Sequence, residues 1–159
     1  MKKIFFIVAI FATAFVQNSF AQDSTNQKRA SQLLSLYYNI KDALVSGNAN
    51  TAALNAKAFV KATNSISDRT ITEANRNALL KDAGIISSAK DIKKQREVFA
   101  NLSANMYALA KSLKITTDSI YYAYCPMKKA YWLSSDKAIK NPYYGSAMLT
   151  CGKVAETLK

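Results

Sequence analysis

The feature that most constrains the fold is a run of seven positions separated alternately by three and four residues. The run consists of Ile92, Gln95, Phe99, Leu102, Met106, Leu109 and Leu113. This spacing places one polar and six apolar side chains on the same face of an α-helix about three heptads long. Such a face must be buried against other helices. We therefore expect a helix that begins at Ser87 or Ser88 and lines a hydrophobic core.

Three earlier segments also have the apolar spacing of amphipathic helices. They cover about residues 27–46, 48–64 and 72–83. Gly47 suits the C-cap of the first helix, and Asn48 or Asn50 suits the N-cap of the second. Gly84 weakens the third helix and is expected to end it. Four amphipathic helices joined by short links predict a mainly α protein with an up-down four-helix bundle.

The sequence changes character after Lys114, where tyrosine, cysteine and methionine become frequent. We expect this Cys/Met/Tyr-rich segment to be extended or irregular. A short C-terminal helix from about Ser146 to Leu158 is expected to close the fold. The bundle has enough apolar side chains to be stable without a metal or a disulfide, which leaves the cysteines available for another role.

The N-terminus resembles a secretory signal peptide. Lys2 and Lys3 give it a positive start, an apolar run of about 13 residues follows, and Ser19-Phe20-Ala21 has the small-x-small pattern of a cleavage site. The apolar run is too short for a membrane span, although a retained anchor is the alternative. We expect cleavage after Ala21, so that residues 1–21 are the signal peptide and residues 22–159 form one periplasmic or secreted domain.

Composition excludes several classes of function. The chain contains no histidine, the commonest zinc ligand and general base. It has no phosphate-binding glycine motif or nucleophile elbow, and we expect no enzymatic activity. The formal net charge is +12, and it falls by two if Lys2 and Lys3 are removed. The basic residues are dispersed rather than clustered, so nucleic-acid binding is not expected, whereas weak adhesion to acidic lipid or sugar is an alternative.

Both cysteines and two of the four methionines lie between residues 125 and 151. Pro126 favours an extended conformation at Cys125, which would place Cys125 and Met127 on one face. Met148 and Cys151 would share a face of a helical turn. If the intervening loop folds back, four sulfur atoms converge. Thiolate and thioether ligands select Cu(I) over hard cations, so these four residues predict a copper(I) site that would also suit silver(I).

Other interpretations of the same residues remain open. Two cysteines in an exported domain often form a disulfide. A Cys125–Cys151 disulfide would then hold a tyrosine-rich surface that docks another envelope protein. The methionines would be core filler, and Trp132 and the tyrosines would serve packing. A thiol redox protein is the least favoured interpretation, because the cysteines do not form a Cys-x-x-Cys pair.

Several segments resemble a known family. They are Tyr38–Gly47, Tyr124-Cys125-Pro126-Met127, Trp132-Leu133-Ser134, Asn141-Pro142-Tyr143-Tyr144-Gly145 and Met148-Leu149-Thr150-Cys151-Gly152. Together they are similar to an uncharacterised envelope domain of Gram-negative bacteria. That domain occurs alone behind a signal peptide or fused to periplasmic adaptor subunits of heavy-metal efflux pumps.

The resemblance implies heavy-metal handling, with copper the expected metal and Cys125, Met127, Met148 and Cys151 the matching ligand candidates. The chain lacks the Cys-Pro-Met-His-Pro form of another metal-binding segment in such pumps, which disfavours zinc. The expected function is therefore a periplasmic copper(I)-binding protein that buffers the metal or passes it to an efflux or maturation partner.

Overall fold

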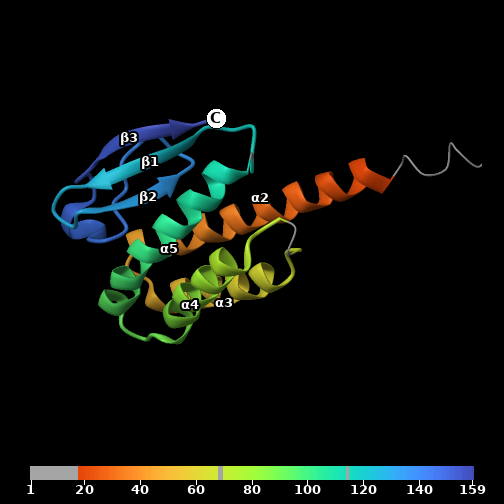
Figure 1. The fold of residues 1–159 in the computed structure, drawn as a ribbon. Coiled ribbons are helices and arrows are strands. Elements are labelled where there is room, and N and C mark those ends of the chain that lie inside the picture. Colours follow the sequence, from red (N-terminus) through yellow and green to blue (C-terminus); the bar gives the residue numbers. More distant parts are fainter. Residues whose placement is uncertain (1–17, 68–69, 114) are drawn as a thin grey trace, which may run out of the picture.

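The computed structural model describes residues 18–67, 70–113 and 115–159 of the chain. Within these residues four helices precede a small antiparallel sheet (Figure 1). The helices are α2 (Asn18–Val45), α3 (Ala49–Asn64), α4 (Glu73–Ser88) and α5 (Ile92–Ser112). Each helix packs on the next along the chain, and α5 also packs on the sheet. The predicted mainly α fold with four helices is confirmed in these residues.

Helices α3, α4 and α5 begin at side-chain caps. Asn48 accepts a hydrogen bond from the backbone N–H of Thr51 at 2.9 Å, as the sequence predicted for this position. Thr72 caps α4 and Asp91 caps α5 in the same way. The predicted start at Ser87 or Ser88 for the helix that became α5 is therefore wrong, because those two serines end α4.

The third helix also runs beyond its predicted end, through Gly84. Ile86, one turn beyond Ala83 and two turns beyond Leu79 on the inner face, is fully buried. Burying such a side chain is worth about 1.5–3 kcal/mol, whereas a glycine inside a helix costs about 1 kcal/mol. Tertiary packing thus outweighs the local propensity of Gly84.

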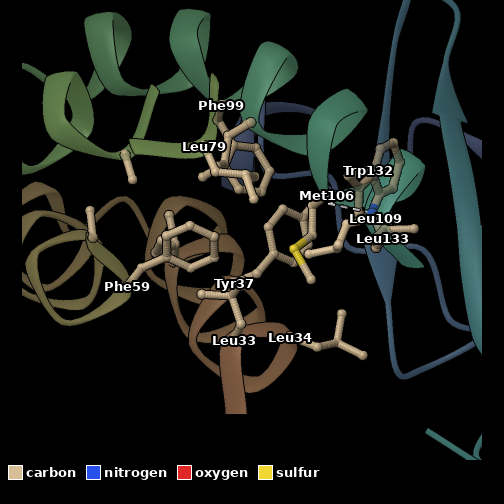
Figure 2. Packing of buried hydrophobic residues seen from close by; sticks show 14 of the residues in the cluster. Leu33, Leu34, Tyr37, Phe59, Leu79, Phe99, Met106, Leu109, Trp132 and Leu133 are labelled. Carbon is tan, nitrogen blue, oxygen red and sulfur yellow. Dashed lines mark hydrogen bonds between the residues drawn. The ribbon is translucent and has the colours of Figure 1, made fainter. Parts of the chain in front are cut away.

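The helical core is built around the run of inner-face positions on α5. Five of its seven members are buried, and the two end members are half-buried. The amide of Gln95, the polar member, donates to the carbonyls of Ala49, Ile86 and Ala89, so it ties α3 and α4 to α5. Figure 2 shows Phe99 and Tyr37 in the middle of this core, which Trp132 joins from the sheet.

The expected extended conformation after Lys114 is confirmed for Ile120–Cys125, but the expected C-terminal helix is wrong, because a three-stranded sheet forms instead. Its strands are β1 (Ile120–Cys125), β2 (Ala130–Ser134) and β3 (Lys153–Leu158), and only a single 3-10 turn, η1 (Gly145–Met148), lies where the helix was expected. The strand order is β2-β1-β3, and both pairings are antiparallel. Side chains of β3 alternate between exposed and half-buried, which is the period of a strand and not of a helix.

Two sequence predictions lie partly or wholly beyond what the structure tests. Residues 1–17 of the predicted signal peptide lie outside the described residues, and its cleavage stays a prediction. No helix among the described residues is both long enough and apolar enough to cross a membrane.

Candidate metal site

Sheet pairing brings the two cysteines together. Cys125 is the last residue of β1, and its neighbour Tyr124 lies opposite Lys153 at the start of β3. Cys151 is two residues before Lys153, so its sulfur reaches the end of β1. The two Sγ atoms are 4.0 Å apart and form no disulfide. The predicted convergence of these two residues is therefore present, although a β pairing produces it.

A four-residue turn supplies hydrogen-bond donors to both sulfurs. Residues 126–129 connect β1 to β2, with Lys129 at a φ of 54°. The backbone N–H of Lys128 donates to Cys125 Sγ at 3.4 Å. The backbone N–H of Met127 donates to the sulfur of Cys151. The Met127 N–H thereby favours the thiolate form of Cys151, which a metal requires.

Asn141 fixes the loop that carries Cys151. Its side chain is fully buried. Its Nδ2 donates to the carbonyl of Cys151 at 2.7 Å, and its Oδ1 accepts from the backbone N–H of Tyr143 at 2.9 Å. Its own backbone N–H donates to the carbonyl of Leu149. Sequence reasoning missed this role, and the only local signal was the turn-forming Asn-Pro dipeptide.

Gly152 allows β3 to start close to the hairpin. Its φ is +150°, and a Cβ there would lie 2.8 Å from the Trp132 ring and 2.9 Å from the carbonyl oxygen of Tyr124. Any larger residue would push Cys151 and β3 away from β1. This close approach therefore contributes to the short distance between the sulfurs.

The electrostatic environment keeps Cys151 protonated when no metal is bound. Burial raises the pKa of the Cys151 thiol, its hydrogen bond and charge interaction with Cys125 raise it further, and the Met127 N–H acts in the opposite direction.

Met148 has the predicted turn conformation beside Cys151, whereas Met127 does not have the predicted extended one. Met127 is in the hairpin turn rather than in an extended segment, and 63% of its surface is exposed. Met148 ends η1, is half-buried and accepts a hydrogen bond from the N–H of Cys151 at 3.1 Å. The predicted turn from Met148 to Cys151 is present, because Leu149 keeps a helical conformation after η1 and this hydrogen bond closes the turn.

The arrangement of donors suits a soft cation. No cluster of three or more His, Cys, Asp or Glu side chains that could hold a metal occurs in the described part of the chain. The cysteine pair offers two sulfurs 4.0 Å apart. With metal–thiolate bonds of about 2.3 Å, this separation corresponds to a sulfur–metal–sulfur angle of about 120°. Such an angle leaves room for further ligands beside the two thiolates.

The helical part of the chain can be assigned to a family. The family model of DUF3347, described as protein of unknown function, matches residues 33–118. The chain belongs to the DUF3347 family. The DUF3347 match runs from α2 through α5 and ends before β1, so Cys125 and Cys151 lie outside it. The predicted membership of an uncharacterised domain family is confirmed.

No curated protein and no solved structure matches this DUF3347 chain. The family therefore supplies a name for the helices, whereas the chemistry of the site depends on the geometry described above.

Proposed function

We propose that this protein binds copper(I) between Cys125 and Cys151 in the periplasm and buffers it or passes it to a partner. The observation that carries the proposal is the pair of unbonded sulfurs 4.0 Å apart. Two strands, a buried asparagine and a close-packed glycine hold this pair. Paired sulfurs held in this way suit a soft monovalent metal better than a hard cation.

Exposure of the site supports metal transfer. Cys125 is fully buried and Cys151 is half-buried, so a metal would approach from the Cys151 side. Met127 and Met148 are the proposed third and fourth ligands. A thioether needs no deprotonation and forms no disulfide, which suits an oxidising compartment. Exposed Met127 would exchange with a ligand of the incoming partner, so the metal moves by ligand substitution.

The proposed partner is an efflux adaptor or a maturation protein. The predicted signal peptide supports a periplasmic location. The resemblance to domains fused to adaptor subunits of heavy-metal efflux pumps supports metal delivery to such a pump. The chain itself would supply no catalysis.

The test is a titration of the reduced protein with copper(I) in competition with a chromogenic chelator. One copper(I) per chain is expected. Removing an outer-shell partner of a metal ligand typically weakens affinity about 10–100-fold. Cys125→Ser or Cys151→Ser removes a ligand itself and is expected to cost more than that. A stoichiometry well below one would overturn the proposal.

The methionine ligands have their own test. The double variant Met127→Leu, Met148→Leu is expected to bind copper(I) more weakly than the unmodified protein. Met106→Leu is the matched control, because Met106 is buried in the helical core and should not affect the metal. Unchanged affinity in the double variant would remove the thioethers from the site.

A second candidate is a protein-interaction module with a structural Cys125–Cys151 disulfide. The proximity of the two sulfurs favours it, since a shift of about 2 Å would bring them to bonding distance. Counting free thiols in protein prepared without reductant separates the candidates. Two reactive thiols per chain support the copper proposal, whereas no thiol and no metal uptake would support the module.

A further inference from the structure

A basic pocket lies next to the cysteine turn. It has a volume of about 380 Å³ and lies between the first turns of α5, the β1–β2 turn and the segment around η1. Three cationic side chains line it: Lys93, Arg96 and Lys128. Two tyrosines also line it, Tyr144 and the almost fully buried Tyr143, and Glu97 is the one acidic residue on the lining.

Arg96 is held in place at the base of this pocket. Its Nη2 donates to the carbonyl oxygen of Leu44, near the end of α2, at 2.8 Å. Gly145 makes room for the guanidinium: its φ is +57°, and a Cβ there would lie 2.5 Å from Arg96 Nη2 and 2.8 Å from the carbonyl oxygen of Val45. The fold therefore fixes the orientation of the guanidinium, and a ligand would meet it already positioned.

The same guanidinium has an unsatisfied donor. Arg96 Nε is buried and has no hydrogen-bond partner. Among the described residues no carboxylate forms an ion pair with Arg96, Lys93 or Lys128, and Glu97 pairs instead with Lys94 at 3.5 Å. Leaving a buried donor without an acceptor is unfavourable, and burial lowers the Arg96 pKa. An anion in the pocket would stabilise the charged guanidinium and so offset the effect of burial on its pKa.

We propose that this pocket binds an organic carboxylate. The planar fork of a guanidinium matches a carboxylate in a two-bond arrangement, and two ammonium groups add attraction. The tyrosines on the lining favour an anion that carries an apolar or aromatic part over an inorganic one. The volume falls at the small end of ligand pockets.

This proposal does not depend on copper binding. Lys128 nevertheless connects the two sites, because its side chain lines the pocket while its backbone N–H donates to Cys125 Sγ. The carboxylate could belong to a free small molecule or to an acidic side chain of another protein. Both sources present the same chemical group to Arg96.

The experiment is a calorimetric titration of the reduced, metal-free chain with four probes: benzoate, acetate, inorganic phosphate and a short glutamate-rich peptide. Benzoate is expected to bind about tenfold more tightly than acetate, because its ring adds contact with the tyrosines. Stronger binding of phosphate than of benzoate would overturn the carboxylate assignment. Peptide binding tighter than benzoate would identify protein side chains as the source, and weaker binding a free acid.

Variants connect the affinity to the pocket. Lys93→Gln with Lys128→Gln removes two cations without disturbing the Arg96 contact to α2, and should weaken benzoate binding about tenfold. Lys57→Gln with Lys61→Gln, on the exposed side of α3, removes the same charge elsewhere and should change the affinity less than twofold. An equal loss of benzoate affinity in the two double variants would contradict the proposal. So would the absence of benzoate binding to the unmodified chain. Titrating the same variants with copper(I) separates the two proposals, because it measures metal binding independently of carboxylate binding.

Discussion

At the scale of single residues, Cys151 decides the chemistry of the proposed site. It is the more accessible of the two thiols, and its sulfur lies against both Cys125 and the Met127 N–H. Because its pKa is raised, the proton stays on the thiol at neutral pH until a metal replaces it. Metal binding is therefore expected to release protons.

The affinity for copper(I) should consequently rise with pH. Below the raised pKa of Cys151, each proton that the metal displaces should strengthen binding about tenfold per pH unit. Chelator competition between about pH 6 and pH 8.5, corrected for the protonation of the chelator, measures this slope. Cys125→Ser should reduce the slope. A flat profile in the unmodified protein would mean that no thiol proton is displaced.

At the scale of elements, the helices were more predictable than the sheet. The inner-face run of α5 is long and regular, so its period indicates a helix without knowledge of its neighbours. Residues 153–158 contain lysine, alanine, glutamate and leucine, which all favour helices. They form β3 because β1 offers a free edge from a distant part of the sequence, and a single-sequence pattern does not contain that information.

The site was predictable only in part for the same reason. The sequence indicated that Cys125 and Cys151 converge, but it attributed this to an extended segment and a helical turn. The structure achieves it through the β1–β3 pairing and the contacts of Asn141 and Gly152. The basic pocket around Arg96 escaped prediction, since its residues come from α5, a turn and a loop that are far apart in sequence.

Asn141 should be needed for both the stability of the loop and the position of Cys151. Asn141→Ala leaves the buried carbonyl of Cys151 and the N–H of Tyr143 without their partners, which should lower the free energy of unfolding by about 1–3 kcal/mol. Urea unfolding measures this change, and copper(I) affinity should fall as well. Asn101→Ala, at an exposed position of α5, should stay within about 0.5 kcal/mol. Equal effects of the two substitutions would contradict this role for Asn141.

At the scale of the whole molecule, tyrosines join the helices to the sheet. Tyr37 on α2 stacks on Phe99 with ring centroids 5.2 Å apart. Its hydroxyl hydrogen-bonds with Ser103 and accepts the backbone N–H of Leu133 on β2. One turn after Ser103 on α5, Tyr107 stacks on Tyr122 of β1 with ring centroids 3.9 Å apart. The position of the sheet, and of the cysteine pair at its end, depends on these contacts.

These tyrosines should make the fold sensitive to alkali. Burial raises the pKa of Tyr37 and Tyr143 and raises the pKa of Tyr122 to about 12. An unfolded tyrosine titrates near pH 10. The stabilisation is therefore complete below about pH 10 and is lost as the pH rises through the folded pKa values. Urea unfolding midpoints measured from pH 8 to pH 11 should fall above pH 10.

Lysines titrate in the same alkaline pH range as tyrosines. The variant Tyr122→Phe separates the contribution of one tyrosine to stability from that of the lysines. The urea unfolding midpoint of this variant should fall less steeply above pH 10 than that of the unmodified protein. A steeper fall in the variant, or a constant midpoint in both proteins, would contradict a role for buried tyrosines in the alkaline loss.

X-ray absorption spectroscopy of the copper(I)-loaded, reduced protein tests the proposed site most directly. We expect a first coordination shell of sulfur alone, with bonds of about 2.3 Å, including both thiolates. The number of sulfur ligands in this shell should decrease in Cys125→Ser and in Cys151→Ser. A shell of nitrogen and oxygen, or a spectrum that neither substitution changes, would contradict copper binding between the two cysteines.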